Sequence, residues 1–124
     1  MQLKGKGTSP DGKRHTCVYD GFVRESDQLP HGAGVKKWSN GEIQEGNFRG
    51  GLMHGQCKST YADGNVYVGE YAEGKKHGRG KLTWANGDVY EGEFRNGKMN
   101  GQGTLTYSNG RRQSGTWRDD KFVG

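Results

Sequence analysis

Apolar and aromatic residues alternate with polar ones in short runs, and most of the runs are followed by a glycine within three residues. The alternation puts Leu82 and Trp84 on one face of a strand, and it puts Tyr90 and Phe94 on one face of the next strand. A period of two residues is that of a β-strand rather than a helix. The pattern therefore predicts a β-hairpin whose turn lies within residues 85–87.

The length of this turn decides whether the rings of the two strands meet. A two-residue turn, 86–87, would send the aromatic side chains of the two strands to opposite faces. A three-residue turn, 85–87, with Gly87 in the left-handed conformation instead pairs Leu82 with Tyr90 and puts every ring on one face. We therefore predict the three-residue turn.

The same register predicts the charged face of the hairpin. It sets Lys81 opposite Glu91 and Arg79 opposite Glu93, and such pairs stabilise strand pairing by about 0.2–1 kcal/mol each. It also pairs glycines across the strands, where a ring can lie over bare backbone that a β-carbon would obstruct. Further glycines are expected in the exit loops between hairpins: Gly50, Gly74 and Gly97.

The hairpin pattern recurs every 23 residues from His31 onward. Four copies in register are typical of a repeat protein whose units pack on their neighbours. We predict repeat units at residues 31–53, 54–76, 77–99 and 100–124. Residues 1–30 are expected to form a variant hairpin that caps the amino end, since residues 19–23 imitate residues 67–71.

The composition agrees with an open repeat architecture. Of 124 residues only 28% are hydrophobic and 24 are glycine, which is too little apolar material for a conventional two-layer core. Three Trp, six Tyr and four Phe at regular intervals argue against disorder. We expect an all-β, elongated, single-layer antiparallel sheet of tandem hairpins.

Motifs for catalysis, cofactors and metals are weak. The histidine column, His31, His54 and His77, has a spacing of two strands or about 9–10 Å, whereas zinc holds its nitrogens at about 2.0–2.1 Å. We expect a loop role for these rings. Cys17 and Cys57 occupy non-equivalent places and are expected to be free thiols. The glycine-rich runs lack the strand-to-helix context of a phosphate loop. We expect no catalytic residue, no cofactor and no metal.

The aromatic residues are the main candidates for partner binding. One interpretation is that they only hold the sheet together. The other is that a single layer cannot bury both faces, so that ring area remains for a helix or peptide of a partner protein. The candidate partner-binding residues are Trp38, Tyr61, Tyr67, Trp84, Tyr90 and Tyr107.

Basic residues in the carboxyl half offer a second surface. With a net charge of +5, Lys75, Lys76, Arg79 and Lys81 form a candidate site for anionic phospholipid headgroups. The alternative is a solvated, salt-bridged surface. Nucleic acid is disfavoured because repeat packing already accounts for the aromatic residues. No run approaches the roughly 18 apolar residues of a membrane span, and the amino terminus lacks a signal-peptide run. We therefore expect a soluble, cytoplasmic chain.

The spacing of glycines, Trp84, Tyr90 and Phe94 within residues 78–97 resembles the MORN (membrane occupation and recognition nexus) repeat. The resemblance covers residues 31–122 closely and residues 1–30 loosely. It departs at three positions, where glycine or tyrosine is expected: Cys57, Gln44 and Gln113.

The resemblance implies successive hairpins curved into an elongated groove, without an active site. It also implies a scaffold that binds a partner helix or peptide in cytoskeletal, ciliary or flagellar assemblies, with self-association or phospholipid binding as further roles. A regulatory segment of a lipid kinase or lysine methyltransferase is another implied setting. That setting stays open because Val123-Gly124 falls where the next unit would begin.

Overall fold

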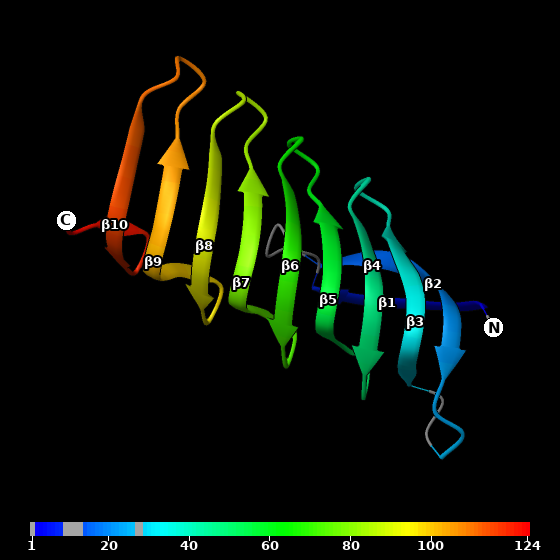
Figure 1. The fold of residues 1–124 in the computed structure, drawn as a ribbon. Helices are drawn as coiled ribbons and strands as arrows, with labels where there is room; N and C mark the ends of the chain where they lie inside the picture. Colours follow the sequence, from blue (N-terminus) through cyan, green and yellow to red (C-terminus); the bar gives the residue numbers. More distant parts are fainter. Residues whose placement is uncertain (1, 9–13, 27–28) are drawn as a thin grey trace.

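The chain forms one open antiparallel sheet (Figure 1). The structure, a computed structural model, describes residues 2–8, 14–26 and 29–124. Within these ranges 11 strands follow one another in sequence order. They are β1 (Gln2–Thr8), β2 (Arg14–Val23), β3 (Pro30–Trp38), β4 (Ile43–Arg49), β5 (Leu52–Thr60), β6 (Val66–Ala72), β7 (Lys75–Thr83), β8 (Val89–Arg95), β9 (Lys98–Thr106), β10 (Arg112–Arg118) and β11 (Lys121–Phe122). The predicted all-β single-layer sheet is confirmed.

The hairpin of β7 and β8 has the predicted register. Leu82 lies opposite Tyr90. The N–H of Trp84 donates to the carbonyl of Asp88 at 2.9 Å, and the N–H of Gly87 donates to the carbonyl of Trp84 at 2.9 Å. Gly87 has a φ of 96°, in the left-handed region. The three-residue turn is therefore confirmed.

Tight turns join each hairpin to the next. Glu73 and Gly74 both have positive φ, at 51° and 80°, and so form a two-residue type I′ turn. The N–H of Gly74 donates to the carbonyl of Met53, one unit earlier, at 2.9 Å. The same bond recurs from Gly51 to Pro30, from Gly97 to Lys76 and from Asp120 to Met99. The exit turns are thus stacked, and the predicted place of the exit-loop glycines is confirmed.

A β-bulge recurs where consecutive hairpins meet. In the pairing of β6 with β7 the register shifts, and Gly78 lies in the bulged segment at a φ of 88°. The N–H of Arg79 then donates to the carboxylate of Glu70 at 2.7 Å, and one unit later the N–H of Gln102 donates to Glu93 at 2.7 Å. Arg79 lies opposite Glu93, as predicted. The Glu93 carboxylate accepts the hydrogen bond from the N–H of Gln102 in the next bulge.

A row of glycines crosses the sheet in register from β2 to β10. Its members are Gly21, Gly34, Gly46, Gly69, Gly80, Gly92, Gly103 and Gly115, and Cys57 takes one place in the row. The ring of Tyr67 lies over Gly80, where a β-carbon would come 2.5 Å from ring atoms Cε1 and Cζ. The Tyr67 hydroxyl reaches across the row and donates to the carbonyl of Glu70 at 2.9 Å. The predicted approach of rings to bare backbone is confirmed.

The core is a layer of side chains on one side of the sheet, which we call the aromatic face. Tyr67 meets Tyr71 and Phe94 edge to face, with ring centroids 5.2 and 5.0 Å apart. Tyr90 meets Phe94 and Trp117 in the same way at 5.2 and 5.5 Å. Such pairs add about 0.5–1.5 kcal/mol each to area burial. The buried cluster also contains Tyr19, Phe48, Met53, Cys57, Met99 and Leu105.

The two departures at Gln44 and Cys57 compensate one another. Gln44 stands where other units carry a tyrosine, so no ring lies over the glycine row there and Cys57 can carry a side chain. The Cys57 thiol donates to the carbonyl of Asn47 at 3.2 Å. This carbonyl is equivalent to the Glu70 carbonyl that takes the Tyr67 hydroxyl. Burial raises the pKa of the Cys57 thiol, which keeps it protonated as a donor.

Candidate functional site

The six candidate aromatic residues differ in exposure. Three are buried: Tyr67 and Tyr90 at 0% exposure and Trp38 at 8%. Three are half-buried and pack against the core cluster: Tyr61, Trp84 and Tyr107. Only the second group therefore has exposed ring area, while the buried rings support the sheet beneath it.

The half-buried rings form one stripe along the aromatic face. Tyr61, Trp84 and Tyr107 each directly follow a strand, β5, β7 or β9, at the start of the three-residue turn. Consecutive members lie two strands apart, a spacing of about 9–10 Å. The Tyr107 hydroxyl donates to the side chain of Gln113 at 2.8 Å, which fixes the end of the stripe.

A ladder of hydrogen bonds that was not predicted from the sequence links the turns beside this stripe. Asp88 Oδ1 accepts a bond from the N–H of Ser108 at 2.8 Å, and Asn65 Oδ1 accepts one from the N–H of Ala85 at 2.9 Å. In the unit before them the acceptor is the buried Glu42. The signal was present in the sequence, as a polar acceptor directly after three of the four turn glycines: Gly41, Gly64 and Gly87.

Replacing Asp88 by alanine is expected to lower the free energy of unfolding by about 1 kcal/mol, because the Ser108 N–H loses its acceptor. Urea denaturation followed by circular dichroism measures this loss. The matched control is Arg111→Ala at the equivalent place in the last unit, where no described hairpin follows, and it should change little. Equal losses in both variants would contradict a ladder between turns.

The four candidate basic residues do not form one surface. Lys75, Arg79 and Lys81 are exposed, and Lys81 pairs with Glu91 at 3.8 Å on the face opposite the rings. Lys76 is half-buried on the aromatic face. Its ammonium Nζ lies 4.9 Å from the ring centroid of Tyr61 and 5.3 Å from that of Tyr67. Burial lowers the pKa of Lys76.

A second lysine on the aromatic face was not singled out from the sequence. Lys36 is half-buried, and its Nζ lies 5.5 Å from the ring centroid of Trp38 and 5.7 Å from that of Phe48. Burial lowers the pKa of Lys36 as well. Its signal in the sequence is a charge at a place that equivalent units fill with uncharged residues: Ser59, Leu82 and Leu105.

Each of these lysines lines a hollow in the surface. The Lys36 hollow has a volume of about 260 Å³ and is bordered by Trp38 and Phe48. The Lys76 hollow has a volume of about 270 Å³ and is bordered by Tyr61 and Leu82. Each hollow thus combines one ammonium group with aromatic and apolar walls.

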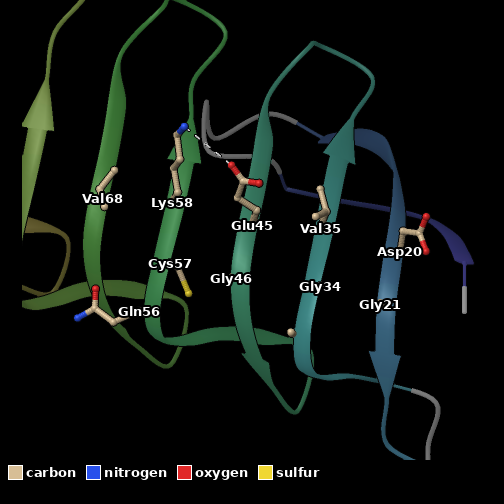
Figure 2. Close-up of a pocket in the computed structure, with 11 residues that line it drawn as sticks. Asp20, Gly21, Gly34, Val35, Glu45, Gly46, Gln56, Cys57, Lys58 and Val68 are labelled. Atoms are coloured by element: carbon tan, nitrogen blue, oxygen red, sulfur yellow. Dashed lines mark ion pairs between the residues drawn. The ribbon is translucent and has the colours of Figure 1, made fainter.

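The opposite face carries a shallow hollow of about 600 Å³ over the glycine row (Figure 2). Figure 2 shows a row of side chains that crosses β2 to β6, beside bare glycine backbone. The row contains Asp20, Val35, Glu45, Lys58 and Val68. Glu45 and Lys58 form an ion pair at 4.0 Å between half-exposed side chains. An ion pair between solvent-exposed side chains is typical of a sheet face that contacts water.

The histidine column serves the exit turns. His31 Nδ1 accepts a hydrogen bond from the N–H of Gly50 at 3.4 Å, and His54 Nδ1 accepts one from the N–H of Glu73 at 3.5 Å. The predicted loop role is confirmed for these two rings. Across residues 2–8, 14–26 and 29–124, no three His, Cys, Asp or Glu side chains gather into a group that could hold a metal ion.

Cys17 and Cys57 are both free thiols. Within the part of the chain that the structure describes, no helix is long and apolar enough to cross a membrane.

A single-layer sheet of hairpins with recurring turns, bulges and aromatic residues defines a β-repeat scaffold. The chain belongs to the MORN repeat family, whose model matches at residues 29–43, 45–66, 67–89 and 90–111. The MORN repeat is generally a non-catalytic module. The matches begin at a different position within the 23-residue repeat from the units counted from His31. Because the repeats follow one another without a gap, the position at which a unit is said to begin is a convention. Residues 1–28 lie outside the matches, although Tyr19 there is buried, as Tyr67 and Tyr90 are.

No curated protein matches the chain. Among solved structures, the chain is similar to the TCP domain of SAS-4 (dCPAP) of Drosophila melanogaster, in complex with a proline-rich motif of Ana2 (dSTIL). The TM-score is 0.45 and the sequence identity 12%, over 92% of this chain and 90% of that chain.

Proposed function

We propose that the chain is a non-catalytic scaffold that binds a helix or peptide of a partner protein across its aromatic face. The observation that carries the proposal is the stripe of half-buried rings, Tyr61, Trp84 and Tyr107, on a sheet only one layer thick. Tryptophan and tyrosine are enriched among the residues that dominate binding energy at interfaces. A partner would complete the burial that a single layer leaves unfinished.

The stripe is held ready for binding by the rings beneath it. Tyr67 and Tyr90 are fully buried and contact their neighbours edge to face. Side chains fixed in advance lose little conformational freedom on association. The ring spacing of about 9–10 Å is close to the rise of two helical turns, about 10.8 Å. An amphipathic helix that crosses the strands would therefore present apolar residues at i and i+7 to successive rings.

An affinity purification from cell extract tests this function. We expect a partner that binds the wild-type chain and is lost with the double variant Tyr61→Ser, Trp84→Ser. The control is Lys37→Gln, Lys58→Gln, which changes exposed side chains on the other face, and circular dichroism verifies that all three proteins fold. A partner that the ring variant retains in full would contradict the proposal.

The setting that we propose is a cytoskeletal or ciliary assembly in the cytoplasm, as the family resemblance implies. The location of a fluorescently tagged chain in ciliated cells tests this part. A membrane tether would need a continuous basic surface, whereas Lys76 and Lys81 lie on opposite faces. We therefore favour the protein partner over the phospholipid.

A further inference from the structure

Two lysines on the aromatic face replace residues that other units use for packing. At the place of Lys76, other units carry Pro30, Met53 and Met99, and all three are buried. At the place of Lys36, other units carry Ser59, Leu82 and Leu105. Both lysines are half-buried. Partial burial of a charge costs free energy unless a partner compensates it, and the uncharged residues at these places in other units avoid that cost.

Among the described residues, neither ammonium group has a carboxylate partner within 4.0 Å. The ion pairs that Lys58 and Lys81 form lie on the opposite face of the sheet.

Two carboxylates, Glu42 and Asp63, border the Lys76 hollow. Glu42 accepts bonds from the Asn40 side chain and the Ala62 N–H, and Asp63 accepts bonds from the N–H and side chain of Asn65. Both carboxylates are therefore already engaged within the turns, and Asp120, whose charge raises the pKa of Lys76 against the effect of burial, accepts a hydrogen bond from the Met99 N–H.

The rings compensate the ammonium groups only in part. A ring face attracts a cation by about 0.5–2 kcal/mol, but it offers no lone pair to the three N–H donors of each lysine. Those donors stay available to an acceptor that enters the hollow. A carboxylate is the acceptor that would also neutralise the charge.

The rings beneath the two ammonium groups indicate the spacing of such carboxylates. The Lys36 Nζ lies over Trp38 and the Lys76 Nζ lies over Tyr61. These rings occupy equivalent places one hairpin apart, which is a spacing of two strands or about 9–10 Å. In a helix, residues i and i+7 lie about 10.5 Å apart on one face.

We propose that the partner segment is acidic and seats two carboxylates, about 10 Å apart, on Lys36 and Lys76. This inference rests on the proposed function, because it names the chemistry of the partner that the stripe of rings binds. It commits to a protein segment with acidic residues at i and i+7 among apolar ones.

Selection from a random library of displayed 16-residue peptides against the wild-type chain tests the inference. We expect enriched peptides to carry Asp or Glu pairs at a spacing of seven. Their affinity, measured by fluorescence polarisation, should fall about tenfold or more for Lys36→Gln, Lys76→Gln. The control Lys37→Gln, Lys58→Gln removes the same charge from the other face and should leave the affinity unchanged. A peptide with Glu→Gln at both acidic positions should lose the same factor and be indifferent to the lysine variant.

Each failure has a distinct meaning. Peptides that need Tyr61 and Trp84 but lack acidic pairs would overturn the inference and leave the proposed function standing. If no enriched peptide depends on those rings, both fail. If phosphatidylserine vesicles, rather than peptides, bind in a manner that depends on Lys36 and Lys76, the ligand is an anionic lipid and the inference is overturned.

Discussion

Replacing Gly80 by alanine is expected to lower the free energy of unfolding by about 3 kcal/mol. The new β-carbon would lie 2.5 Å from Cε1 and Cζ of Tyr67. That ring has no room to move, because it is fully buried between Tyr71 and Phe94. Overpacking costs about 1–3 kcal/mol, and a displaced hydroxyl loses its bond to the Glu70 carbonyl, about 1 kcal/mol more. Urea denaturation of both proteins measures the difference.

A compensating variant identifies the cause of this loss. Tyr67→Gln combined with Gly80→Cys reproduces, one unit along, the native pair of Gln44 and Cys57. We expect the double variant to be more stable than the sum of the two single changes predicts, by about 1–2 kcal/mol. Strictly additive losses would mean that the backbone itself demands glycine, which would contradict the requirement for space beneath the ring.

The hairpin could be predicted from the sequence because two patterns, the strand alternation and the positions of the aromatic residues, agree on only one turn. Alternation alone left the turn at 86–87 or 85–87, and a change of one residue reverses the face of every side chain on a strand. Only the longer turn puts Leu82 and Tyr90 together. The aromatic residues therefore fixed the register, and Gly87 supplied the left-handed residue that the turn needs.

The β-bulges could not be predicted from the alternation of residues within a hairpin. Gly78 follows the strand alternation and pairs regularly with Phe94 of β8, yet on its other side it lies in a bulge against β6. The shift depends on pairing with the preceding hairpin, to which the Glu70 carboxylate contributes an acceptor. The pattern within one hairpin carries no information about that contact between hairpins.

The site was predicted as a class of residues rather than residue by residue. Tyr61 and Tyr67 are the same residue type in the same unit, and contacts with Tyr71 and Phe94 bury Tyr67 fully whereas Tyr61 stays half-buried. Lys76 was grouped with Lys75 because they are adjacent in the sequence. Adjacent residues on a strand face opposite sides, and so the basic cluster of the sequence is divided in the fold.

Replacing Tyr90 by alanine is expected to lower the free energy of unfolding by about 4 kcal/mol, the range found for large buried aromatic residues. The ring is fully buried, and it contacts Phe94 and Trp117 edge to face. Its hydroxyl donates to the carbonyl of Glu93 at 2.9 Å. Burial raises the pKa of Tyr90 to about 12, so the hydroxyl keeps its proton at neutral pH.

Two further variants separate the contributions to this loss. Tyr90→Phe keeps the ring and should cost only about 1 kcal/mol, the value of one hydrogen bond. Tyr107→Ala removes a half-exposed ring of the stripe and should cost about half as much as Tyr90→Ala, because less apolar area is buried there. Urea denaturation of the three variants measures these values. Equal losses for Tyr90→Ala and Tyr107→Ala would contradict the division into supporting and binding rings on which the proposed function rests.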